Sequence, residues 1–141
     1  MLAELQEADA RFLIVGAHAL SVLGVPRATV DLDIWIDARP ENARRVWAAL
    51  AAFGAPMESL GISLADFSRP DVIVQFGLPP WRVDIMTSIS GVTFDEAWPR
   101  RVEGAFDDLQ VQYIGRDAFI RNKRATGRNK DLGDIDALDG K

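Results

Sequence analysis

Residues 27–36 read Arg27-Ala-Thr-Val-Asp-Leu-Asp-Ile-Trp-Ile36, an alternation of polar and apolar side chains. Because successive side chains of a β-strand point to opposite faces, the pattern predicts a strand with Asp31 and Asp33 on one face. Two ionised carboxylates this close repel each other unless a cation neutralises them, and hard oxygen ligands suit Mg²⁺ or Mn²⁺. An Asp-x-Asp pair alone is weak evidence, since Asp134 and Asp136 form another. The flanking sequence therefore has to carry the inference.

A turn that suits phosphate precedes this strand. The apolar run Arg11-Phe-Leu-Ile-Val-Gly16 is followed by good helix formers, which predicts a strand over 11–16, a tight turn, and a helix over 17–23. Backbone N–H groups exposed at such a turn can hold phosphate oxygens, and glycine lets the ligand come close. Together with Arg27 and Thr29 on the approach to the carboxylates, this arrangement suits a metal-bound nucleoside triphosphate.

Four ordered motifs make the chain similar to the nucleotidyltransferase superfamily, and most of all to AbiEii-type and related small nucleotidyltransferase-like proteins. The motifs are Gly16-Ala17, Arg27-x-Thr29-x-Asp31-x-Asp33, Asp84 within Arg-Val-Asp-Ile-Met86, and Lys123-Arg-Ala-Thr-Gly-Arg-Asn-Lys-Asp-Leu-Gly-Asp134. The resemblance covers roughly residues 11 to 138, and four motifs in order are more specific than any one of them. The family usually has Gly-Gly or Gly-Ser where this chain has Gly16-Ala17.

The resemblance implies a fold and a set of residue roles. The expected fold is α/β (α+β), a nucleotidyltransferase-like fold with a mixed sheet of about four to six strands flanked by helices. Asp31, Asp33 and Asp84 would be catalytic and would hold Mg²⁺ or Mn²⁺, and Asp84 would also take the hydroxyl proton. The nucleotide-binding residues would be Gly16, Ala17, Arg27, Thr29, Lys123, Lys130 and Asp131.

Ordinary structural explanations compete with several of these roles. Asp84 could pair with Arg82, and Arg27 with an aspartate. Asp131 and Asp134, three residues apart on a helix, could pair with Arg128 or Lys130. Lys123 and Lys130 are seven residues apart, which would put them on one side of a continuous helix, although Gly127 predicts a break there.

Composition favours a single domain over residues 1–141, since 141 residues with 48% hydrophobic content suffice for one core. The absence of cysteine excludes disulfides and thiolate sites, and the single histidine makes an ordinary zinc site unexpected. No apolar stretch approaches the roughly 20 residues of a membrane span, so we expect a cytoplasmic protein with no membrane association. The net charge of −5 argues against a general nucleic-acid coat. Basic side chains nevertheless gather in residues 116–130, where they could grip a triphosphate or an RNA end.

The remaining elements follow from periodicity and turn residues. We expect helices over 2–9 and from Pro40 onward, with the apolar face Ala43, Val46, Trp47, Leu50 and Phe53, and a helical turn near 63–67. Two hairpins are predicted, one from strands 71–77 and 81–86 joined by Leu-Pro-Pro, the other from strands 101–105 and 109–114. Two helices separated at Gly127 complete the chain.

Three functions stay open at this point. The first is a metal-dependent nucleotidyltransferase that modifies an RNA end, a protein or a small molecule, and the resemblance implies a toxin whose partner is an antitoxin. The second is a nucleotide-binding protein with little or no turnover, acting as a regulatory or antitoxin-like partner, which Ala17 and the small size favour. The third is a nuclease or phosphodiesterase using the same carboxylates, which would leave the glycine turn unused.

Overall fold

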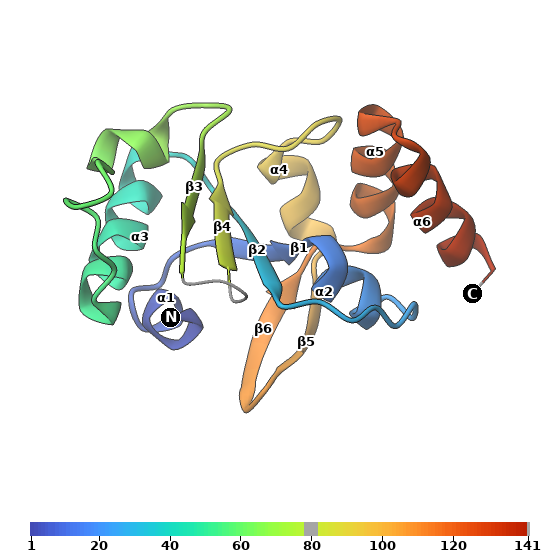
Figure 1. The fold of residues 1–141 in the computed structure, drawn as a ribbon, viewed down its shortest axis with the longest axis horizontal. Coiled ribbons are helices and arrows are strands. Elements are labelled where there is room, and N and C mark those ends of the chain that lie inside the picture. Colours follow the sequence, from blue (N-terminus) through green and yellow to red (C-terminus); the bar gives the residue numbers. More distant parts are fainter. Residues whose placement is uncertain (78–81, 141) are drawn as a thin grey trace.

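The computed structural model describes residues 1–77 and 82–140, and its centre is a six-stranded mixed sheet (Figure 1). The strand order is β3-β4-β2-β1-β6-β5. The strands are β1 (Phe12–Val15), β2 (Asp31–Ile36), β3 (Ile73–Phe76), β4 (Arg82–Met86), β5 (Val102–Phe106) and β6 (Leu109–Tyr113). The expected α+β fold with a mixed, helix-flanked sheet is confirmed.

The centre of the sheet is built by pairings between distant parts of the chain. β2 runs antiparallel to β1 and parallel to β4, while β1 also pairs in parallel with β6. The two predicted hairpins, β3–β4 and β5–β6, are antiparallel and form the two edges. The Leu-Pro-Pro connection expected between β3 and β4, together with Trp81, lies outside the described residues.

Helices flank the sheet (Figure 1). They are α1 (Leu2–Glu7), α2 (Gly16–Val22), α3 (Pro40–Phe53), α4 (Phe94–Ala97), α5 (Arg116–Thr126) and α6 (Asn129–Asp139), with 3₁₀ turns η1 (Leu64–Ser68) and η2 (Trp98–Arg100). α1 and α3 lie at the left end in Figure 1, and α5 and α6 at the right end. Within the described ranges no helix is long and apolar enough to cross a lipid bilayer.

The two faces of β2 have different roles because its side chains alternate. Ile34 and Ile36 are completely buried, while Leu32 on the same face lines an apolar hollow together with Leu2 of α1 and Phe53 of α3. The opposite face carries Asp31, Asp33 and Trp35. Trp35 is covered by α4, whose Phe94 ring meets it edge-on at 5.1 Å. The first half of this face, which carries the aspartates, therefore stays partly open.

The element predictions differ from the structure in two instructive places. α4 was not expected, because four residues are too few to show a helical period. The continuous helix that would hold Lys123 and Lys130 on one side is wrong, because α5 ends and Gly127 takes a left-handed conformation with φ of 65° before α6 begins. The predicted break at Gly127 is confirmed.

Candidate functional site

A row of carboxylates crosses two parallel strands at the open half of the sheet. The pairing of β2 with β4 sets Asp33 beside Asp84, and Asp31 beside Arg82. Partners in adjacent strands project from the same face, so all three predicted metal ligands belong to one patch. Gln75 of β3 is the next partner in this row, opposite Asp84. Sequence reasoning missed Gln75, because only the strand register reveals its neighbour.

Asp33 lies at the electrostatic centre of the patch. Burial raises the pKa of its carboxyl from 3.8 to about 6, and the negative charges of Asp84 and Asp31 add to the rise. The positive charge of Lys123 opposes this rise and lowers the pKa of Asp33. The ionised carboxylates destabilise one another, so the site favours binding a proton or a cation.

Arg82 supplies the nearest positive charge on the side of β4. Its Nη2 lies 3.8 Å from Asp31 Oδ2, and its Nε lies 3.5 Å from Asp84 Oδ1. The buried Asp84 Oδ1 nevertheless accepts no hydrogen bond from any residue that the structure describes. The ordinary partner foreseen for Asp84 is therefore present, but it does not satisfy this oxygen.

The turn at Gly16 packs directly against the Asp33 carboxylate. Val15 pairs with Asp33 in the sheet, and Gly16 follows with a positive φ of 71°. A Cβ at position 16 would collide with Asp33 Oδ2 and lie 3.1 Å from its Cγ. Glycine is required here both for the backbone conformation and for the space that Asp33 fills.

A cavity of about 250 Å³ opens beside this turn, between the segment that leads into β2 and the two C-terminal helices. Six predicted nucleotide contacts line it: Gly16, Ala17, Arg27, Thr29, Lys123 and Lys130. Asp31 and Asp33 line it too, whereas Asp84 is not among its walls. The remaining walls are Leu20, Ala28, Phe119, Arg128 and Asp134. Among them, Phe119 is a contributor that the sequence pattern gave no reason to single out.

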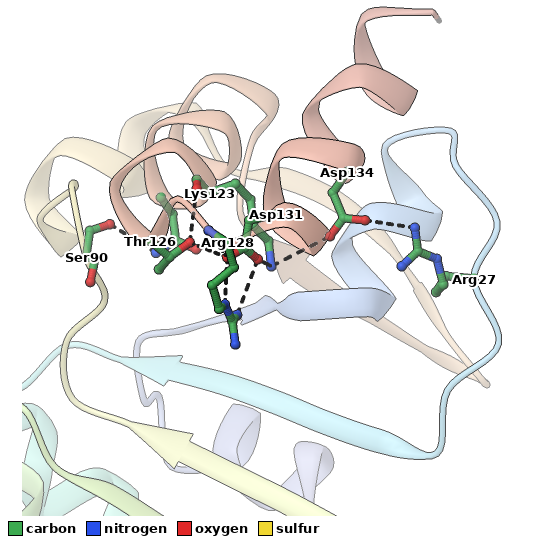
Figure 2. Close-up of polar contacts among 8 residues, drawn as sticks. Arg27, Ser90, Lys123, Thr126, Arg128, Asp131 and Asp134 are labelled. Atoms are coloured by element: carbon green, nitrogen blue, oxygen red, sulfur yellow. Dashed lines mark hydrogen bonds and ion pairs between the residues drawn. The ribbon is translucent and has the colours of Figure 1, made fainter.

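The basic wall of the cavity is held in place by Asp131, as Figure 2 shows. The Asp131 carboxylate is completely buried and accepts hydrogen bonds from Thr126 Oγ1 at 2.7 Å, Arg128 Nε at 2.7 Å and Lys123 Nζ at 3.3 Å. These contacts hold the pKa of Asp131 far below its usual range, the hydrogen bond from Arg128 contributing most. Asp131 was expected to touch the nucleotide, but its carboxylate oxygens instead accept hydrogen bonds from Lys123 and Arg128.

A second ion pair ties the loop before β2 to α6. Arg27 Nη2 donates to Asp134 Oδ1 at 2.8 Å, and Lys123 Nζ lies 3.9 Å from Asp134 Oδ2 (Figure 2). Arg27 thus pairs with an aspartate while still lining the cavity. Lys123 forms ion pairs with Asp131 and Asp134 of α6, and its positive charge also lowers the pKa of Asp33.

The donor set suits a hard divalent cation, although the side chains do not enclose one as they stand. Across residues 1–77 and 82–140, no three acidic or histidine side chains converge as a ready metal site. Asp33 and Asp84, neighbours across the β2–β4 pair, would supply two carboxylate ligands for Mg²⁺ or Mn²⁺, and Asp84 Oδ1 has no hydrogen-bond partner among the described residues. Asp31 would be the third ligand if its side chain rotated away from Arg82 and toward Asp33.

Comparison with known proteins adds no assignment, because no protein-family model and no curated protein matches the chain. The chemistry of the site must therefore be argued from its own geometry. Carboxylates whose chemistry suits a cation border a polar cavity that also has a glycine turn and basic side chains in its wall. This arrangement can bind a polyphosphate and neutralise it from several directions.

Proposed function

We propose that the protein is a metal-dependent nucleotidyltransferase, which moves a nucleoside monophosphate from a nucleoside triphosphate to a hydroxyl acceptor and releases pyrophosphate. One observation carries the proposal. The carboxylates Asp31 and Asp33 and the cations Lys123 and Lys130 line one cavity, and the strand register sets Asp84 beside Asp33. A nuclease would use the carboxylates without needing a triphosphate, whereas a glycine turn and several basic side chains around one cavity suit the linked phosphates of a triphosphate.

Each group has a role in this reaction. Asp31, Asp33 and Asp84 would hold Mg²⁺ or Mn²⁺, which neutralises the triphosphate and lowers the pKa of the attacking hydroxyl. Lys123, together with Lys130 and Arg128 at the cavity wall, would bind phosphate oxygens. The Gly16-Ala17 turn would let the phosphates lie close to the backbone.

The covalent step then balances without a further reactant. The acceptor oxygen bonds to the α-phosphorus, and the bond from that phosphorus to the oxygen of pyrophosphate breaks. The hydroxyl proton passes to a carboxylate, for which Asp84 is suited because its buried Oδ1 has no hydrogen-bond donor among the described residues. Acceptors of this chemistry include an RNA end, a protein hydroxyl and a small molecule. If the acceptor is needed for growth, the enzyme would act as a toxin that an antitoxin restrains.

The test is transfer of a labelled nucleotide. The purified protein is incubated with α-³²P-labelled nucleoside triphosphates, Mg²⁺ and either total RNA or cell protein, and the label and the pyrophosphate are followed. We expect label on a macromolecule together with stoichiometric pyrophosphate, and loss of both with Asp33→Ala. Asp136→Ala, on the exposed side of α6, is the matched control and should keep full activity. Shortening of RNA without any triphosphate would instead indicate a nuclease.

A second candidate is a nucleotide-binding regulatory partner with little turnover. It is favoured by Ala17, which lines the cavity but offers no hydroxyl to a phosphate. Under this alternative, triphosphate binds with the same dependence on Lys123, but no label reaches any acceptor. Equilibrium binding measured alongside the transfer assay separates the two functions.

A further inference from the structure

We propose that Arg82 is an internal counterion of the metal site: it occupies the carboxylates in the metal-free protein and is displaced when Mg²⁺ or Mn²⁺ binds. This inference deepens the proposed function and rests on it for the identity of the site. It assigns Arg82 a positioning role, since the residue would act on the carboxylates and on neither substrate.

The strand register gives Arg82 this place. It is the partner of Asp31 across the β2–β4 pair and stands two residues before Asp84 on β4, so its side chain shares the carboxylate face. From there its guanidinium reaches two of the three carboxylates, at 3.8 Å from Asp31 and 3.5 Å from Asp84. Arg82 therefore bridges the same two strands that a metal ion would bridge.

Three other cations of the cavity wall, Lys123, Arg27 and Arg128, are paired with aspartates of α6. Lys123 contacts Asp131 and Asp134 on α6, and Arg27 donates to Asp134. Among the residues that the structure describes, Arg82 alone forms ion pairs with Asp31 and Asp84. Without Arg82, the negative charges of Asp31 and Asp84 would have no ion-pair partner among the described residues.

The ion pairs of Arg82 with Asp31 and Asp84 are weak enough for a metal ion to displace them. Both distances are longer than those of charge-assisted hydrogen bonds, and the Arg82 side chain is 52% exposed. A Mg²⁺ ion binds carboxylate oxygens at about 2.1 Å, so the ion and the guanidinium cannot both lie between the same oxygens. Once displaced, Arg82 can extend into solvent without losing a buried partner. Metal affinity in the intact protein is then reduced by the competition from Arg82.

The first measurement is a Mn²⁺ titration of the full chain followed by electron paramagnetic resonance, with no triphosphate present. Arg82→Gln removes the competing cation and should tighten Mn²⁺ binding by about tenfold or more. Arg44→Gln is the control, because Arg44 is exposed on α3 and changes the net charge equally. It should leave the affinity unchanged.

The second measurement observes displacement directly in the wild-type protein. The ¹⁵N resonance of Arg82 Nε is assigned by comparison with the Arg82→Gln spectrum, and Mg²⁺ is added. We expect the resonance to move toward the position of a free arginine side chain, and to stay in place when Asp33 is replaced in Asp33→Asn.

The outcomes separate the two proposals. Equal, measurable Mn²⁺ affinity of wild type and Arg82→Gln overturns the role of Arg82 and leaves the proposed function standing. Tighter binding by Arg82→Gln with an unmoved Nε resonance also overturns it, since the effect would then be one of charge at a distance. No Mn²⁺ binding by either protein contradicts both, because freeing the carboxylates would not have created a metal site.

Discussion

Position 16 is the residue at which the backbone and the site depend most directly on each other. Gly16→Ala must place a methyl group against Asp33 Oδ2 while keeping a φ of 71°. We expect a loss of about 1–3 kcal/mol in the free energy of unfolding, because an L-residue is strained there and the neighbouring carboxylate must move. Urea unfolding measures the loss, and triphosphate titration should show weakened binding in the folded variant.

The control for this substitution is another glycine-to-alanine change in the same chain. Gly133 lies inside α6, and a Cβ there would meet no atom within 4 Å. Gly133→Ala should raise stability by about 0.5–1 kcal/mol through helix propensity. If Gly16→Ala behaved like Gly133→Ala, the close packing of the turn against Asp33 would be refuted.

The raised pKa of Asp33 gives the metal-free protein a defined pH dependence. The folded state holds the Asp33 proton with a pKa of about 6, against 3.8 for the unfolded chain. Protonation therefore stabilises the fold, and this contribution is complete below about pH 4 and lost as the pH rises through about 6. The Asp33→Asn variant lacks this ionisable group and should not lose stability as the pH rises. The free energy of unfolding of Asp33→Asn relative to wild type should therefore be greater at about pH 8 than at about pH 4. Urea unfolding in the presence of a chelator measures this, and a pH-independent difference would count against it.

Among the elements, the pair α5 and α6 depends on a single buried carboxylate. Asp131 on α6 accepts from Thr126 and Lys123 of α5 and from Arg128 between the helices. Asp131→Asn leaves these donors poorly matched, and we expect a loss of about 2–4 kcal/mol in unfolding free energy. Because the pKa of Asp131 is lowered in the folded state, its contribution is present above about pH 4 and disappears as the pH falls further.

The same substitution tests what the helix pair does for the cavity. Lys123 would no longer be fixed, so phosphate binding should weaken even under conditions where the variant is folded. Asp136→Asn, an exposed carboxylate of the same helix, is the control and should change neither property. Undiminished triphosphate affinity of folded Asp131→Asn would show that Asp131 is important for stability alone.

At the scale of single elements, the sequence pattern predicted the strands and helices whose positions depend on local residues. Alternation located β2, the Gly16 turn separated β1 from α2, and Pro40 began α3 at its first residue. Local pattern could not give the parallel pairings of β2 with β4 and of β1 with β6, which join residues far apart in the chain. The adjacency of Asp84 to Asp33 came from the resemblance, because nothing in Arg82-Val-Asp-Ile-Met86 alone reveals its neighbour.

The site was predictable to a similar extent. The glycine turn, the paired aspartates and the two lysines were selected in advance, and they line one cavity. The pairing of Asp84 with Arg82 was foreseen, but the burial of Asp131 and the second contact of Arg82, with Asp31, depend on three-dimensional packing that a sequence motif does not show. The nucleotidyltransferase resemblance itself stays a prediction, since no family model or curated protein supports it.

For the whole molecule, the proposed site connects the central sheet to the C-terminal helices. A triphosphate bound with Mg²⁺ would contact β2 from one side and α5 and α6 from the other, so it should stabilise the folded state as a unit. At about 100 times the dissociation constant this amounts to about 2.7 kcal/mol, or a rise in Tm of about 10 °C for a chain of this size. Differential scanning calorimetry measures the shift.

The shift has to depend on both partners of the site. Mg²⁺ or triphosphate added alone should give a smaller rise in Tm, because each neutralises the charge that holds the other. The double variant Asp31→Asn with Asp33→Asn should fold but show almost no shift with the two together, whereas Asp107→Asn with Asp108→Asn, in the β5–β6 turn, should respond like wild type. Equal shifts in all three proteins would mean that the triphosphate binds away from β2. In that case the basic wall formed by Lys123 and Lys130 would have to be assigned to a different ligand.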